Sequence, residues 1–149
     1  IRLTVIGISQ SLPLRPWIRQ LSPGKDSIYP RFAPWLRRQA PFFDVGIAPL
    51  IDNAFNQFKS DLKILEYLAM GLVPVASACQ PYLDSSAIEN KALCSDANEW
   101  LSRLAALAAD SGEFEKHKLS AVAKSQYLWS ERSSAATGNK IANRICELL

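Results

Sequence analysis

The chain has 149 residues, of which 48% are hydrophobic and 21% charged, as is typical of one globular domain of ordinary size. No apolar run approaches the roughly 18 residues that cross a membrane, and no signal peptide is visible, so we expect a cytoplasmic protein rather than an integral membrane protein. The formal net charge is only +3.

This charge is unevenly distributed along the chain. Residues 1–40 carry seven Lys or Arg residues against one acidic residue, Asp26, for a net charge of +6, whereas residues 41–149 carry a net charge of −3. The basic segment is either a solvated surface or one that faces phosphates or an anionic membrane, so peripheral contact with the inner face of a membrane stays open. A nucleic-acid partner is not expected, because no basic helix carries interleaved stacking aromatics.

The first 40 residues predict two strands and a short helix. Residues 1–8 form an apolar strand ending at Gly7, the kind of strand end at which doubly wound folds bind phosphates, although a lone glycine is a weak signal. A second strand is predicted over 17–21, and a helix over 29–38, in which Trp35 is expected in the core rather than on a nucleotide base. Because the chain opens inside a strand without a methionine, we expect a piece of a longer protein.

Residues 44–77 predict a strand–helix–strand unit, the building block of parallel sheets. The sequence predicts strands over 44–50 and 73–77, a polar loop over 51–59, and a helix that Ser60 caps and Gly71 ends. One helix stripe is expected to pack on the sheet; it comprises Leu62, Leu65, Leu68 and Ala69.

The flank beside this stripe carries Lys59, Lys63 and Glu66. Two lysines near a helix N-terminus are disfavoured by the helix dipole by about 0.3–1 kcal/mol each, and a bound phosphate would reverse that effect. The alternative is a solvated Lys63–Glu66 ion pair without a ligand, and spacing alone favours this alternative.

The remaining residues predict an irregular loop, a short strand and a series of helices. Asp96 and Glu99 form a variant of the capping box ahead of a helix that runs to about Ala109 and stops near Gly112. Ser130 is expected to cap a last helix. The loop is expected over 78–86, the strand over 91–95, a second helix over 113–127, and the apolar positions of the last helix are Ile141, Ile145 and Leu148.

Several kinds of chemistry are not indicated by the sequence. His117 is the only histidine, and the cysteines at 79, 94 and 146 have no paired or metal-like spacing, so we expect reduced thiols and neither a metal site nor a histidine-based triad. No Asp-x-Asp motif occurs. Ser60, Ser77 and Cys79 have no visible base nearby and are not expected to act as nucleophiles.

The string FNQFKSDLKILEYLAMGLVPVAS (residues 55–77) resembles the signature FN..KS..K.LEY.A.G.PVVAS of group 1, family-4-like glycosyltransferases of the GT-B fold. In that family the signature follows a strand reading D.G.APL. This chain carries the same pattern at Asp44, Gly46, Ala48, Pro49 and Leu50. The match is close over residues 44–77 and loose over most of the remaining chain.

The resemblance implies an α/β, doubly wound parallel sheet (Rossmann-like), the C-terminal donor-binding lobe of a two-lobe enzyme, with its first strand and helix and its whole partner lobe missing. Residues 1–149 would then be a single nucleotide-sugar-binding domain. Glu66 would accept hydrogen bonds from the donor's ribose, and Lys59, Ser60 and Lys63 would lie near its diphosphate. Lys59 and Lys63 would act as the catalytic cations of a metal-independent, cofactor-free transfer.

One departure from the family pattern concerns the donor sugar. Many relatives carry a first glutamate eight positions before the second, and this chain has Phe58 there. The direct sugar contact of that glutamate is therefore missing. Asn56 or a backbone N–H could replace it.

Together these features predict a glycosyltransferase of the kind used in polysaccharide biosynthesis, acting on a nucleotide-sugar donor and a saccharide or lipid-linked acceptor. Retention of anomeric configuration is implied by the family alone, and the choice among UDP, GDP and ADP donors stays open. This piece by itself is expected to be inactive. The alternatives are a nucleotide-sugar epimerase and a non-catalytic Rossmann-like binding or scaffold module.

Overall fold

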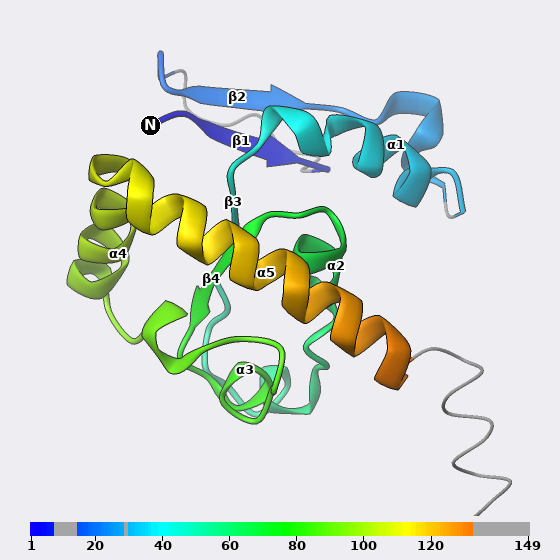
Figure 1. Ribbon diagram of the computed structural model, residues 1–149. Coiled ribbons are helices and arrows are strands. Elements are labelled where there is room, and N and C mark those ends of the chain that lie inside the picture. Colours follow the sequence, from blue (N-terminus) through cyan, green and yellow to red (C-terminus); the bar gives the residue numbers. More distant parts are fainter. Residues whose placement is uncertain (8–14, 29, 133–149) are drawn as a thin grey trace, which may run out of the picture. The chain divides into compact units, whose positions relative to one another are not determined.

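The computed structural model describes residues 1–7, 15–28 and 30–132 of the chain (Figure 1). By its contacts the chain divides into two compact units, Ile1–Phe43 and Asp44–Leu149. Each unit holds a small parallel β-sheet together with helices. The predicted α/β class is therefore confirmed, and this arrangement is compatible with a Rossmann-like fold. That the whole chain forms one nucleotide-sugar-binding domain stays a prediction.

The N-terminal unit is built on two strands that lie within the predicted ones. In their parallel pairing Leu3 lies opposite Ile18, and Ile6 lies opposite Leu21. No described residue of this unit is buried, and its Trp35 is half-buried, with its ring centroid 5.9 Å from that of Phe32. The elements of this unit are β1 Leu3–Ile6, β2 Ile18–Leu21, the 3-10 turn η1 Gly24–Ser27, α1 Phe32–Gln39 and the 3-10 turn η2 Ala40–Phe42.

The C-terminal unit contains the strand–helix–strand segment and its sheet. The strands run parallel in the order β3-β4-β5, with Val45 opposite Val73 and Ser77 opposite Cys94. Four of the five residues of the central strand are buried, so β4 is the centre of this unit. The elements here are β3 Val45–Ala48, the 3-10 turn η3 Asn56–Phe58, α2 Leu62–Ala69, β4 Val73–Ser77 and β5 Leu93–Cys94.

Helix α2 differs from its prediction in where it begins and in which face it buries. Asp61 occupies the N-cap position without a side-chain capping bond, so the prediction that Ser60 caps the helix is wrong. The buried residues are Ile64 and Leu68, whereas Leu62 and Ala69 are exposed. The buried face is therefore rotated from the predicted stripe, because the side chains at i and i+4 from Ile64 meet the sheet.

The helices after β5 follow the predicted order. The Asp96 Oδ1 atom accepts the N–H groups of Asn98 and Glu99, at 2.8 and 2.9 Å, so the predicted cap is confirmed. The first of these helices ends at Ala109 as predicted, and Gly112, near the predicted stop, lies in the first turn of the next helix, where the Asp110 carboxylate accepts its N–H at 2.8 Å. The two helices are α4 Ala97–Ala109 and α5 Ser111–Arg132. Between β4 and β5 lie α3 Gln80–Leu83 and the 3-10 turn η4 Asn90–Ala92, so the prediction of an irregular loop over 78–86 is wrong where α3 forms.

Ser130 was the predicted cap of a separate terminal helix, and that prediction is wrong. Ser130 lies within α5, where its hydroxyl donates to the Tyr127 carbonyl at 2.6 Å. The predicted apolar positions Ile141, Ile145 and Leu148 lie outside the described residues. In the described part of the chain, no helix combines the length and the apolar character needed to cross a membrane.

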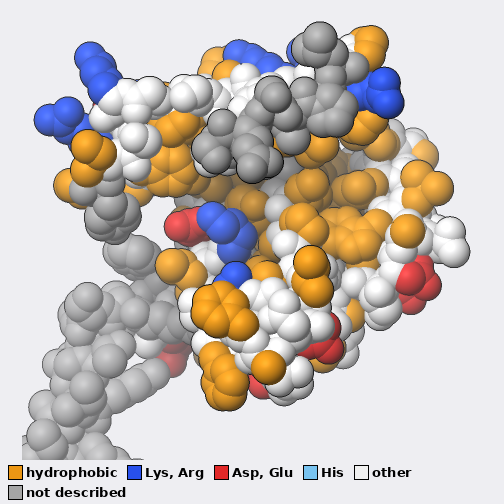
Figure 2. Space-filling view, turned by 180° about the vertical axis from the view of Figure 1, so that it is seen from behind, with side chains coloured by type: hydrophobic (Ala, Val, Ile, Leu, Met, Phe, Trp, Pro, Cys, Tyr) orange, Lys and Arg blue, Asp and Glu red, His pale blue; other side chains and the backbone are white. Residues whose placement is uncertain are grey.

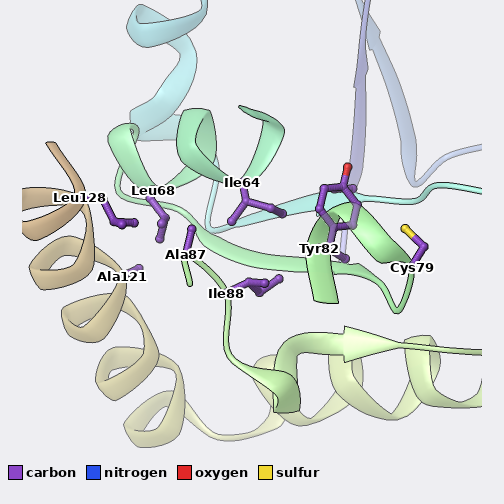
Figure 3. Close-up of a cluster of buried hydrophobic side chains, with 10 residues drawn as sticks. Ile64, Leu68, Cys79, Tyr82, Ala87, Ile88, Ala121 and Leu128 are labelled. Carbon is purple, nitrogen blue, oxygen red and sulfur yellow. The ribbon is translucent and has the colours of Figure 1, made fainter. Parts of the chain in front are cut away.

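Two apolar clusters cover the two faces of the sheet in the C-terminal unit. Side chains alternate between the faces of a strand, and accordingly Ala76 packs in one cluster while Val73 and Val75 pack in the other. The first cluster joins α2, the 87–88 segment and α5 (Figure 3). The second joins the sheet to Leu107 of α4. Helices on both faces hold the sheet, and the loops at its carboxyl edge carry the candidate site.

Candidate functional site

The loop between β3 and α2 is held together by one buried amide side chain. Asn56 is buried, and its Nδ2 atom donates to the Ile51 carbonyl at 2.7 Å, while its backbone N–H donates to Asn53 Oδ1 at 2.9 Å. The Lys59 N–H in turn donates to the Asn56 carbonyl at 3.1 Å. Asn56, predicted to contact the donor, therefore has a structural role in this loop, because its amide fixes the loop's shape.

The carboxyl ends of β3 and β4 are joined by side-chain hydrogen bonds. The N–H of Leu50, two residues beyond the end of β3, donates to Oγ of Ser77, the last residue of β4, at 2.9 Å. Farther out, the Ser85 hydroxyl donates to Asp61 Oδ2 and accepts the Ala87 N–H at 3.0 Å. The loop after β4 is thus tied to the start of α2. No local sequence pattern indicates the Asp61–Ser85 contact, because the two residues are far apart in the chain.

Three predicted site residues lie exposed at the start of α2. Lys59, Ser60 and Lys63 are all exposed, and the Lys59 Nζ atom lies 5.3 Å from the centre of the Phe55 ring. A cation above an aromatic face is attracted by the ring's quadrupole, which holds the ammonium group over the loop. The side chain of the N-cap residue, Asp61, makes no capping bond to the first N–H groups of α2.

Glu66 is engaged by one of these lysines. The Lys63 Nζ atom lies 2.6 Å from Glu66 Oε2, and both side chains are partly open to solvent. The spacing of these two residues predicts this ion pair as the alternative to a ligand site. An exposed i,i+3 pair of this kind contributes about 0.3–0.5 kcal/mol. The carboxylate has two oxygens, so it retains the capacity to accept further hydrogen bonds.

Gly7 belongs to the N-terminal unit, whereas the other predicted site residues belong to the C-terminal unit. Its role in binding stays a prediction. Gly7 has a φ of +77°, follows β1 and is exposed, and its N–H lies 3.4 Å from the Leu21 carbonyl oxygen. The positive φ explains the glycine, because other residues rarely adopt this conformation.

Two residues of the family-like pattern have a packing role instead. A Cβ atom on Gly46 would lie 2.3 Å from Cγ of Tyr67, so only glycine lets this ring lie against β3. The Tyr67 hydroxyl donates to the Ile47 carbonyl at 2.7 Å. Burial, with smaller contributions from Tyr82 and Glu66, raises the pKa of Tyr67 to about 12. This contact holds α2 on the sheet and thereby positions Lys63 and Glu66.

The described cysteines are buried and poorly suited to nucleophilic chemistry. Cys79 and Cys94 are free thiols, and burial raises the pKa of each; the nearby Asp52 carboxylate raises that of Cys79 further. A thiol with a raised pKa is mostly protonated, and the thiolate is the nucleophile. Over the described ranges, no group of three or more His, Cys, Asp or Glu residues could hold a metal ion.

A small cavity lies on another part of the C-terminal unit, between α5 and the segment after α3. It has a volume of about 30 Å³ and is lined in part by Glu89, His117, Ser120 and Lys124. The Ser120 hydroxyl donates to Glu89 Oε1 at 3.2 Å, which fastens α5 to this segment. A volume of this size suits about one water molecule and is too small for a nucleotide.

No protein-family model, no curated protein and no solved structure matches the chain.

Proposed function

We propose that the chain is the donor-binding lobe of a GT-B glycosyltransferase, which transfers a sugar from a nucleotide diphosphate sugar to a saccharide or lipid-linked acceptor. The observation that carries this proposal is the exposed group Lys59, Ser60 and Lys63 at the start of α2. It lies in a β3–α2–β4 unit whose sequence resembles the donor-binding segment of this family. Ligands of open α/β sheets bind outside the carboxyl ends of the strands, where this group lies.

The chemistry of the transfer suits these residues. When the bond between sugar and diphosphate breaks, negative charge builds on the leaving diphosphate, and fixed cations and helix N–H groups stabilise it. Lys59 and Lys63 supply the cations, and the first turn of α2 supplies the N–H groups. Glu66 accepts hydrogen bonds from the ribose hydroxyls through the acceptor capacity that the Lys63 contact leaves.

Calorimetric titration of UDP, GDP and ADP into this chain tests the proposal. We expect saturable binding of one nucleotide, weakened about tenfold by Lys63→Ala or Glu66→Ala, because each removes a charged hydrogen bond of about 1.5–3 kcal/mol. The identity of the nucleotide that binds would name the base of the donor.

The chain offers a matched control for these two variants. Glu113 and Lys116 on α5 form an exposed i,i+3 pair with the same 2.6 Å separation. Glu113→Ala and Lys116→Ala should leave nucleotide affinity unchanged. Equal effects from both pairs, or no binding of any nucleotide by the folded chain, would contradict the proposal.

A non-catalytic binding or scaffold module is the second candidate, and two observations favour it. Lys63 and Glu66 already satisfy one another. The position of the family's first glutamate holds Phe58, which cannot hydrogen-bond a sugar through its side chain. Nucleotide binding without sugar turnover, measured with the chain joined to an acceptor-binding lobe, would favour this candidate.

A further inference from the structure

The loop that leads into α2 presents large apolar side chains to solvent. Ile51 and Phe55 are each 77% exposed, Phe58 is 91% exposed and Leu62 is 57% exposed. Hydrophobic side chains lie beside Lys or Arg side chains on the lower part of the face drawn in Figure 2. Exposed apolar side chains gathered in one short segment mark an interaction site more often than scattered ones do.

The two phenylalanines share one side of a rigid turn. They lie three residues apart across η3, and in a 3-10 turn side chains at i and i+3 stand one above the other. Buried Asn56 holds this turn through its bond to the Ile51 carbonyl, and the Gln57 N–H donates to the Asn53 carbonyl at 3.1 Å. These hydrogen bonds fix the backbone from which the two exposed rings project, and a fixed backbone lowers the entropy cost of binding a ligand.

The same loop also carries exposed carboxylate and amide side chains. Asp52, Asn53 and Gln57 are exposed, and Gln57 Nε2 lies 3.4 Å from Asp52 Oδ1. A membrane would have to desolvate this carboxylate and these amides together with the rings, which is unfavourable. The combination of aromatic faces and hydroxyl-binding groups instead matches a sugar ring, which has an apolar C–H face and a rim of hydroxyl groups.

We propose that Phe55 and Phe58 form an aromatic platform that binds the apolar face of a saccharide, with Asp52 and Gln57 hydrogen-bonding its hydroxyls. The Lys59 Nζ atom lies over one face of the Phe55 ring, so the saccharide would stack on the opposite face of that ring. The inference deepens the proposed function and rests on it for its biological role, because the platform adjoins the predicted diphosphate site and would hold the sugar. In the family that the sequence resembles, the first glutamate of the pattern contacts the sugar. In this chain the aromatic rings would make that contact instead.

Saturation-transfer NMR tests this proposal on the intact chain, with the methyl β-glycosides of glucose, galactose, mannose and N-acetylglucosamine at millimolar concentration. We expect saturation of the C–H protons on one ring face of at least one glycoside. Replacing both rings, in Phe55→Ala/Phe58→Ala, should weaken the signal about tenfold. Both rings are exposed, so the variant should keep its fold, which circular dichroism checks.

Phe42→Ala is the matched control, because Phe42 is 75% exposed and belongs to the N-terminal unit. An equal loss of signal in this control, or no saturation of any glycoside, would overturn the platform. Two further results for the Phe55→Ala/Phe58→Ala variant would also overturn the platform. Loss of binding to phosphatidylcholine vesicles would assign the rings to a membrane, and a lower apparent mass on size exclusion would assign them to contact with a second copy of the chain.

The proposal and the proposed function can fail separately. Nucleotide binding that depends on Lys63, without ring-dependent saturation of a glycoside, would reject the platform and retain the donor-lobe function. Ring-dependent glycoside binding without nucleotide binding would retain the platform and reject that function.

Discussion

Individual residues of the glycosyltransferase-like pattern can be explained by packing as well as by chemistry. Gly46 is required because the Tyr67 ring occupies the space where a Cβ atom would lie. Tyr67 is in turn held by its bond to the Ile47 carbonyl. At these positions the residues of the pattern attach a helix to a strand.

Gly46→Ala is expected to destabilise the chain by about 3 kcal/mol, because overpacking of a well-packed contact costs typically 1–3 kcal/mol and this Cβ would overlap the ring. Urea unfolding measures the change. Gly112→Ala is the control, since its Cβ would meet one side-chain atom, Asp110 Oδ1, at 3.3 Å and would not overlap a ring. Replacing the ring by Tyr67→Leu should make Gly46→Ala much less costly, and simple additivity of the two changes would contradict this explanation.

At the scale of elements, aspartate side chains determine where α4 and α5 begin. Asp96 caps α4 as predicted, and the Ser95 N–H donates to Glu99 Oε2 at 2.7 Å. Asp110 does the same for α5, since its Oδ1 atom accepts the Gly112 and Glu113 N–H groups. A new helix thus begins where a glycine predicted a stop, because a carboxylate just ahead of it satisfies the free N–H groups.

Asp96→Ala should lower the free energy of unfolding by about 1 kcal/mol, because it leaves two N–H groups of α4 without their side-chain acceptor. Thermal unfolding followed by circular dichroism would measure it. Asp84→Ala is the comparison, because Asp84 is also exposed but accepts a bond from the Gln80 side chain and caps no helix N-terminus within the described residues. Equal losses in the two variants would show that capping is not the cause.

At the scale of the whole molecule, the two units differ in charge and in burial. Ile1–Phe43 carries the +6 segment and has no buried described residue, whereas Asp44–Leu149 holds both apolar clusters. A two-stranded sheet without a core is marginal by itself, so the measurable stability of the chain belongs to the C-terminal unit. Tyr67 accounts for one part of the dependence of this stability on alkaline pH, because burial raises its pKa to about 12.

Unfolding experiments at rising pH test this dependence. Below pH about 10 the phenol is neutral in both states, and above it the unfolded chain loses the proton while the folded chain keeps it. Stability should therefore fall as pH rises from about 10 to about 12, by roughly 3 kcal/mol in the wild type. Tyr67→Phe should lack this part of the decline, and Tyr127→Phe, which removes an exposed phenol, should retain it. Parallel curves for all three proteins would contradict the assignment.

Short apolar runs and polar turn residues were enough to predict the strands of the C-terminal unit, the Asp96 cap and the α/β class. These features depend on neighbours in sequence, which is why a sequence indicates them. The candidate lysines and Glu66 were likewise visible as one flank of a helix, since their spacing alone places them together.

The tertiary structure decided which face of α2 is buried, and local spacing could not. A helix turns by about 100° per residue, so a stripe centred on Leu62 and one centred on Ile64 are equally compatible with the pattern until the sheet and α5 are present. The same holds for the Ser85 hydroxyl, which donates to Asp61, and for Tyr67, which donates to the Ile47 carbonyl. Spacing along the chain does not indicate these contacts, because the fold brings their partners together from distant parts of the sequence.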